Sequence, residues 1–424
     1  MNGPGGSSRE KAGGFRRRAA RLLKAGAMLI GAGGLLIFPI GAKGEESKVV
    51  ASAAIRQEYN DNLFFDSQGG KRDFITTVSP GLEWVARMEV LDFSLLGRLD
   101  ALRYWMSHEF DTVDYNLQSG VQYRLDPRTS FSAAAGSSRD SRPDRDIEVS
   151  GLVLGPQARD RWFYTLGGSY LFSEIASLGV QFNQSEDEYN DPDFLDTRGY
   201  AGSIFFTRDL GDLLPLLKGK ATFAYGQYFY GISETEGYRW TLGGEWAFSE
   251  KWNMIVDLGL SRTRSKFQVT TLLPVGPFLV PVSQEEISTT WGGVGQFSLV
   301  FRDDATGGGI SLQQDIIPAS GRGALWSTSL RMYMDQRFTH EIKGGLSASY
   351  YYNRAGEGEF SAEEIENHTF NFSAWLRYEF TRDMSIEASY GYAQTLDQVA
   401  DTEADRSLFL VRFFIQQDLL DLFR

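Results

Sequence analysis

The chain has 424 residues, of which 14% are aromatic and 46 are glycine, yet only 42% are hydrophobic and the mean hydropathy is -0.28. A helical membrane protein would be far more apolar. The absence of cysteine excludes disulfides, thiol catalysis, cysteine-ligated metals and a lipid-modified N-terminal cysteine. The formal net charge of -13 at pH 7 argues against nucleic-acid binding.

Residues 1–44 have the composition of a targeting segment. Five basic residues between positions 16 and 24 precede an apolar run over residues 25–40, and Ala42, Lys43 and Gly44 form a small-x-small cleavage site. The alternative is a single transmembrane anchor, which is disfavoured because the run is short and glycine-rich and is followed at once by Glu45 and Glu46. We therefore expect a signal peptide over residues 1–44 and a folded region over residues 45–424.

From residue 48 onward, short segments alternate apolar and polar residues, and each ends in a polar turn. In residues 252–263, Trp252, Val256 and Leu260 would share one face of an extended strand, whereas Asn253 and Asp257 would share the other. Residues 238–248 and 384–392 alternate in the same way. A helix would mix the two sets, because its period of 3.6 does not sort alternate positions. The pattern predicts strands with one apolar and one polar face.

The predicted strands number about 18, an even number as in bacterial single-chain barrels. They begin near Lys48, Phe74, Leu91, Asp111, Thr129, Arg161, Ser177, Asp196, Leu217, Thr235, Trp252, Thr289, Gly307, Leu325, His340, His368, Met384 and Arg406. Long connections at 61–73, 138–159, 184–195, 268–288, 355–367 and 395–405 alternate with short ones at 88–90, 126–128, 173–176, 249–251, 303–306 and 381–383. The exceptions are a short link at 108–110 and a longer one at 208–216.

This alternation of loop length predicts the fold class. Long outer loops, short periplasmic turns and two periplasmic termini are the rule in outer-membrane barrels, whereas sandwiches and propellers have no reason to alternate loop length. We expect an all-β protein, a transmembrane antiparallel up-and-down β-barrel of about 18 strands, with 16–18 as the range.

Aromatic residues, one apolar segment and the acidic loops add three further expectations. Eight aromatics near strand ends are predicted to form the girdle at the membrane surfaces, namely Trp84, Trp105, Trp162, Phe172, Trp246, Trp252, Trp326 and Trp375. Residues 271–282 are apolar, and Pro274, Pro277 and Pro281 argue against a strand interior. This segment could constrict a pore or touch a partner, or it could pack over the barrel mouth. Acidic loop residues could bind divalent cations that bridge to lipopolysaccharide, or could be solvated surface.

Three motifs at the start of the folded region carry a family resemblance. They are EYNDNLF at residues 58–64, DFITTVSPGL at residues 73–82 and YRLDPRT at residues 123–129. Together they resemble the β-barrel porin 2 family of outer-membrane proteins. The resemblance covers mainly residues 50–130 and implies a barrel associated with exopolysaccharide biosynthesis and export. It carries over no catalytic or ligand residue.

The polar faces of the predicted strands indicate a water-filled lumen. The residues inferred to line it carry both charge signs: Arg98, Asp100, Arg124, Arg239, Glu245, Asp257, Arg331, Asp335 and Glu387. In a wide barrel such residues orient polar solutes, although cross-strand salt bridges would also explain them. Phe163, Phe205 and Tyr228 are inferred lumen aromatics that could stack on sugars or simply pack. The leading hypothesis is a porin-like channel that passes polar solutes or exopolysaccharide across the outer membrane of a Gram-negative bacterium.

Two other functions stay open. A barrel of this kind could instead be a scaffold that sheathes or anchors an export complex or an electron-transfer partner such as a periplasmic cytochrome. An outer-membrane hydrolase is disfavoured, since the chain has only His108, His340 and His368 and lacks a G-x-S-x-G turn and zinc-type histidine spacing. We expect no cofactor and no bound metal.

Overall fold

The computed structural model describes residues 46–142, 146–153, 157–191, 194–231, 233–275, 278–319, 323–356, 359–360 and 364–419. The predicted signal peptide over residues 1–44 lies outside these residues. No helix in the described ranges combines the length and the hydropathy that a membrane span needs.

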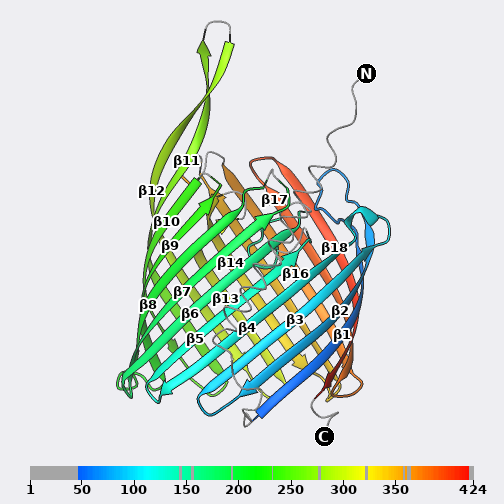
Figure 1. The fold of residues 1–424 in the computed structure, drawn as a ribbon, viewed down its shortest axis with the longest axis vertical. Coiled ribbons are helices and arrows are strands. Elements are labelled where there is room, and N and C mark those ends of the chain that lie inside the picture. The colour runs from blue at the N-terminus through cyan, green and yellow to red at the C-terminus, as the bar shows by residue number, and fades with distance from the viewer. Residues whose placement is uncertain are drawn as a thin grey trace, which may run out of the picture.

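The strands form one antiparallel sheet that closes on itself, because β1 pairs with β2 along one edge and with β18 along the other. Figure 1 shows the strands tilted around a single barrel. The 18 strands are β1 (Glu46–Asn60), β2 (Asp73–Arg87), β3 (Leu91–Tyr104), β4 (Thr112–Asp126), β5 (Thr129–Asp140), β6 (Arg159–Ser173), β7 (Ala176–Tyr189), β8 (Thr197–Asp209), β9 (Leu217–Tyr230), β10 (Ser233–Trp246), β11 (Trp252–Val275), β12 (Phe278–Arg302), β13 (Thr306–Ala319), β14 (Gly323–Arg337), β15 (Ile342–Ala355), β16 (Ile365–Glu379), β17 (Met384–Asp397) and β18 (Thr402–Asp418). A 3-10 turn, η1 (His108–Phe110), follows β3. The predicted fold class and strand count are confirmed.

The two rims of the barrel differ, as the loop pattern predicts. At one rim the connections are short, for example 88–90, 127–128 and 174–175, and β1 begins and β18 ends there. At the other rim lie the longest connections, 61–72 and 141–158. Some links at that rim are short because the strands themselves are longer than predicted, as at 231–232 and 398–401.

Strands β11 and β12 correct one expectation. They pair with each other as far as Val275 and Phe278, so most of residues 271–282 is strand and not an irregular loop. Beyond Lys266 the ribbon has no pairing with β10, and β12 pairs with β13 only from Gly295 onward. Both strands of the ribbon are therefore edge strands there, where proline is tolerated because no neighbour needs its missing N–H. Figure 1 shows this ribbon projecting beyond the rim.

Alternate positions on each strand face opposite sides of the wall, and the cross-strand register keeps the same residues on one face around the whole closed sheet. The outward face carries large exposed apolar side chains on many strands, for example Ile55, Leu99, Leu166, Leu242 and Leu258. We call the inner face the lumen face. It is polar along most of the wall, as in a barrel that has lipid outside and water inside.

The aromatic girdle is only partly as predicted. Trp84, Trp105, Phe172 and Trp252 are exposed. Trp162 and Trp326 are instead buried, and the register places Trp375 on the lumen face opposite Gly345. Alternation in sequence cannot show which aromatic residues other parts of the chain will cover.

Candidate functional site

The register places all nine residues inferred to line the lumen on the lumen face: Arg98, Asp100, Arg124, Arg239, Glu245, Asp257, Arg331, Asp335 and Glu387. Several of them form short ion pairs along the wall. Arg98 Nε lies 3.0 Å from Asp100 Oδ2, and Arg124 lies 3.3 Å from Asp92. The first pair lies within β3, and the second joins β4 to β3 as a cross-strand salt bridge, which is one of the two interpretations that the sequence leaves.

Other members of the set have more specific partners. Arg239 on β10 pairs with Asp315 on β13, although these two strands are not neighbours in the sheet. Glu245 accepts a hydrogen bond of 2.8 Å from the Asn253 side chain. Arg331 Nη2 donates to the backbone oxygen of Val149, at 3.0 Å. This last contact joins the wall to a connection that enters the barrel.

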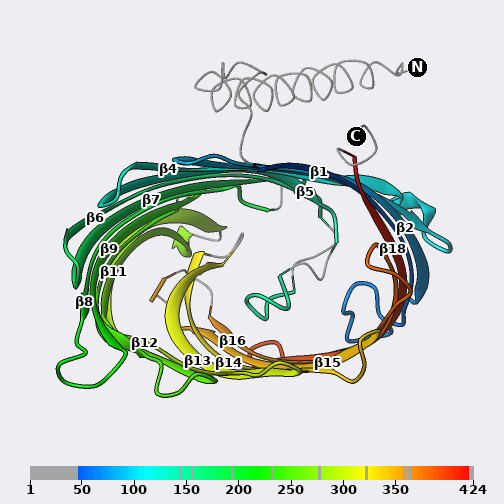
Figure 2. The ribbon, with the colours of Figure 1, turned by 90° about the horizontal axis from the view of Figure 1, so that it is seen from below.

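That connection lies between β5 and β6, and we call its described residues, 141–142, 146–153 and 157–158, the inner loop. Viewed along the barrel in Figure 2, the coloured part of this connection lies within the ring of strands and not over its outer surface. Its base is held by two ion pairs. Arg142 donates to both carboxylate oxygens of Glu58 on β1, at 2.8 and 2.9 Å, and Arg159 lies 3.0 Å from Asp146. Glu58 is 1% exposed, so the first pair is formed inside the protein.

The tip of the inner loop is bonded to the opposite wall. Five side chains of β14, β15 and β16 donate hydrogen bonds to successive backbone oxygens of the tip. We call them the latch residues: Arg331 to Val149, Tyr351 to Glu148, Asn353 to Ser150 at 2.7 Å, Thr369 to Gly151 at 2.6 Å, and Asn371 to Ile147 at 3.0 Å. Because backbone oxygens inside a protein need partners, this set of donors fits a loop held in one position.

A second element also enters the lumen. The far ends of β13 and β14 bend inward, as Figure 2 shows, and Ile316, Ile317 and Ala324 line a small cavity together with residues of β8–β11. The bend explains how Asp315 reaches Arg239 across the barrel mouth.

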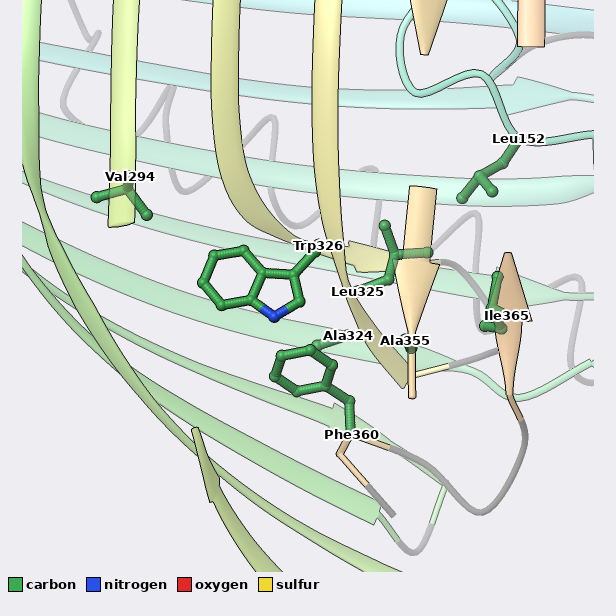
Figure 3. Packing of buried hydrophobic residues seen from close by; sticks show 8 residues of the cluster. All are labelled: Leu152, Val294, Ala324, Leu325, Trp326, Ala355, Phe360 and Ile365. Carbon is green, nitrogen blue, oxygen red and sulfur yellow. The ribbon is translucent and has the colours of Figure 1, made fainter. Parts of the chain in front are cut away.

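The two inward elements meet in an apolar cluster. Its buried members are Leu152, Val294, Ala324, Leu325, Trp326, Ala355, Phe360 and Ile365. Figure 3 shows Trp326 lying beside Phe360, and the two rings make an edge contact with centroids 6.2 Å apart. Trp326 Nε1 also donates to Glu359, at 2.8 Å. The mouth of the barrel therefore has a hydrophobic core of its own, built from the inner loop, the bent hairpin and the connection after β15.

We call the inner loop and the bent β13–β14 hairpin together the plug. The first connection, residues 61–72, packs against it. Phe65 has a left-handed backbone with φ 55° and forms a buried cluster with Ile147 of the inner loop and Ala393 of β17. Asn62 holds the turn, since its amide donates to the backbone oxygens of Asp66 and Asp405, at 3.0 and 2.9 Å. The polar motif after β1 thus has a structural role.

Below the inner loop, the lumen contains a cavity of about 750 Å³. Its walls come from β1, from β14–β18 and from the loop itself. Charged side chains on its lining are Arg56, Glu58, Arg142, Glu148, Arg331, Arg377, Glu387 and Arg406. The cavity is large enough for a small polar solute, and its lining contains five arginines and three glutamates.

The sequence predicts a different constriction. It offers residues 271–282 as a segment that could fold into the pore, but the ribbon that contains most of them projects away from the barrel. The inner loop occupies that place instead. The sequence signal for it is a group of apolar residues in a loop that begins with charged residues: Ile147, Val149, Leu152, Val153 and Leu154.

The three lumen aromatics are packed side chains. Each lies against the glycine directly opposite it on the preceding strand, with Phe163 on Gly136, Phe205 on Gly179 and Tyr228 on Gly199. A side chain at any of these glycines would overlap the ring. This contact supports the packing interpretation over stacking on sugars.

The histidines are dispersed. His108 is exposed beside Asp111, at 3.7 Å, and His368 contacts Tyr350 and Gln398, at 2.6 and 3.0 Å. Within the described ranges no group of three or more His, Cys, Asp or Glu side chains is arranged to hold a metal ion.

No protein-family model matches the chain, and no curated protein matches it. The resemblance to the β-barrel porin 2 family therefore stays an expectation. Among solved structures, OccAB4 from Acinetobacter baumannii is 10% identical, with a TM-score of 0.46, 89% of this chain covered and 99% of that chain. OpdK from Pseudomonas aeruginosa, solved with vanillate, is 10% identical, with a TM-score of 0.46, 87% of this chain covered and 99% of that chain.

The ferric citrate transporter FecA is also 10% identical, with a TM-score of 0.45, 83% of this chain covered and 60% of that chain. Similarities of this size identify neither a family nor a ligand for this chain.

Proposed function

We propose that the protein is an outer-membrane channel that passes small polar solutes through a mouth narrowed by the inner loop. The observation that carries this proposal is the closed barrel of 18 strands whose lumen face is polar and whose mouth is partly filled by the inner loop. A barrel of 16–18 strands is wide enough to hold an aqueous channel. An internal loop then sets the size of what passes.

The membrane location follows from the outward face. Leu242 and Leu258 are 71% and 65% exposed, and similar side chains occur around the barrel. Leaving so much apolar area in water costs roughly 25 cal/mol per Å², and a monomer in solution rarely exposes such a surface. A lipid phase covers it without requiring any other protein. A sequence with a signal peptide would bring such a barrel to the outer membrane.

The upper limit on solute size is inferred from the plug, which narrows the lumen. The inner loop and the bent β13–β14 hairpin share a buried cluster, so they fill part of the cross-section. A polymer chain would need this cluster to separate, whereas a small solute needs only the remaining space. We therefore favour small polar solutes over exopolysaccharide as the cargo. The same plug disfavours the sheath hypothesis, because a partner threaded through the barrel would compete with it.

Conductance across a planar lipid bilayer tests the proposal. Purified protein is expected to produce discrete current steps in potassium chloride, and protein unfolded before addition is the control. Polyethylene glycols of graded size then report the width, and only the small ones are expected to reduce the current. Folded protein that inserts and yet carries no current would refute the channel. Entry of large polymers would refute the narrowed mouth.

A further inference from the structure

A row of charged side chains crosses six adjacent strands on the lumen face, and we call it the basic row. Each member is directly opposite the next in the cross-strand register. In order from β14 to β18 and then β1, the members are Arg337, Lys343, Arg377, Glu387, Arg412 and Arg56. Five are cations and one is a carboxylate. Because the strands are tilted, a row perpendicular to them climbs the wall, as the tilt in Figure 1 indicates.

The single carboxylate of the row lies deeper than its cations. Glu387 is 13% exposed, whereas the Arg377 and Arg412 side chains that share it are 34% and 37% exposed. Arg377 donates to Glu387 through Nε at 2.8 Å, and Arg412 Nη2 lies 3.1 Å from the other carboxylate oxygen. Glu387 therefore orients two guanidinium groups, and these groups are more exposed to the lumen than the carboxylate is.

The row continues into the cavity below the inner loop. Glu58 repeats the arrangement, because Arg56 and Arg142 both lie against a carboxylate that is 1% exposed. Among the charged residues that line the cavity, five are arginines and three are glutamates. Outside the cavity, Lys343 pairs with Glu379 at 2.6 Å, and Asp335 lies on the same face of β14 as Arg337. Cations remain in excess after these acids are counted.

This excess of cations is unfavourable for the stability of the sheet, so a contribution to folding does not explain it. Arg412 and Arg56 are directly opposite each other where β18 meets β1, and like charges in that position destabilise a sheet. The chain as a whole carries a net charge of -13, so this local excess of cations is opposite in sign to the chain. On β5, β7 and β8, the lumen-face positions between the rims are uncharged. The basic row therefore gathers cations along one part of the wall, and Lys218 and Lys220 of β9 lie on the lumen face outside it.

We infer that the basic row and the cavity above it bind solutes that carry an oxyanion, a carboxylate or a phosphate, on their way through the lumen. Guanidinium groups fit such groups because two parallel N–H donors match two oxygens. A cationic wall beside a narrow passage also raises the local concentration of anions. This inference rests on the proposed channel function and adds the charge class of its substrate.

Reversal potentials in a potassium chloride gradient at low salt test the inference. The native channel is expected to prefer chloride over potassium. At contact distance in water, one unit charge changes the concentration of a monovalent ion by about fivefold. The double variant Arg377→Gln/Arg412→Gln is therefore expected to lower the anion-to-cation permeability ratio by roughly fivefold or more. Arg124→Gln, which removes a lumen cation outside the row, is the matched control and is expected to change the ratio little.

Block of the chloride current by added solutes distinguishes a site for carboxylates from a site for phosphates. Galacturonate and inorganic phosphate are expected to reduce the chloride current, whereas galactose, which has the size of galacturonate without its charge, is not. If only one of the two anions blocks, the row is specific for that group. A channel that conducts without preferring anions, or a double variant with the native ratio, would overturn the inference and leave the channel function standing.

Direct binding keeps the inference testable if no current is seen. Trp375 lies under the guanidinium of Arg377, with 5.6 Å between the guanidinium carbon and the ring. Galacturonate is expected to change the tryptophan fluorescence of detergent-solubilised protein, and the change should be lost in Trp375→Phe and weakened in the double variant. Absence of saturable binding to well-folded protein would reject the basic row as a site even if the channel conducts.

Discussion

The latch between the inner loop and the wall is the most informative feature to perturb. Three of the five latch residues can be replaced by uncharged residues that lack a hydrogen-bond donor in the side chain, in the variant Asn353→Ala/Thr369→Val/Asn371→Ala. Each change removes one hydrogen bond to a loop oxygen, at 2.7, 2.6 and 3.0 Å. A hydrogen bond of this type contributes about 1 kcal/mol net, so the variant weakens the closed position of the tip by roughly 3 kcal/mol. That corresponds to an increase of roughly 100-fold in the equilibrium constant for release.

Thiol labelling measures this release directly, because the chain contains no cysteine. Ile147 is 1% exposed at the tip of the inner loop, so a cysteine introduced there by Ile147→Cys is protected while the tip is closed. In that background, the latch variant is expected to react with a water-soluble maleimide roughly 100-fold faster, provided that closing is faster than labelling. Single-channel records of the same variant are expected to show a larger or more variable current.

The matched control lies on the same two strands. Ser347 and Ser373 hydrogen bond to each other at 2.6 Å across β15 and β16. In the Ile147→Cys background, Ser347→Ala/Ser373→Ala is therefore expected to leave the labelling rate unchanged. If the latch variant and this control label at the same rate, the three hydrogen bonds removed do not hold the loop and the reasoning fails. Heat-modifiable mobility on gels verifies that both proteins are folded.

Three further outcomes are expected. Glu58→Gln removes the charged partner of Arg142 from a buried pair and should lower the free energy of unfolding by roughly 3 kcal/mol. Urea titration in liposomes measures this, and an unchanged midpoint would contradict the prediction. Replacement of residues 268–285 by Asn-Gly should leave assembly and conductance intact, because the described backbone of this segment pairs within the ribbon and with neither β10 nor β13; failure of the variant to assemble in vitro would refute this prediction. Gly179→Val should cost about 1–3 kcal/mol by displacing Phe205, and Phe205→Ala should recover part of that loss in the same titration.

Much of the wall was predictable from the sequence. Every strand except β12 begins within four residues of its predicted start, and the long and short connections fall at the predicted rims. The reason is that alternation and turns are local properties, since a strand with lipid on one side and water on the other must alternate along its own length. The predicted start of β12 is wrong because proline argues against a strand interior, whereas both strands of the ribbon are edge strands there and tolerate it.

The plug was not predictable in the same way. The sequence predicts a long connection at residues 138–159, yet nothing periodic in it indicates that the inner loop lies inside the barrel. Their partners Tyr351 and Thr369 lie more than 200 positions away along the chain. Lumen-face donors such as Asn353 and Asn371 look like any other wetted side chains until the loop oxygens are placed beside them.

From the sequence alone follow a barrel of about 18 strands, the polar and apolar faces of most strands and the rim that carries the long loops, because each of these is set by neighbours within one strand and its turn. Which connection fills the mouth, and which cations lie side by side along one wall, are properties of the folded barrel. Those relations exist only after β18 has paired with β1, since closure alone brings Arg412 beside Arg56 and the latch residues within reach of the inner loop.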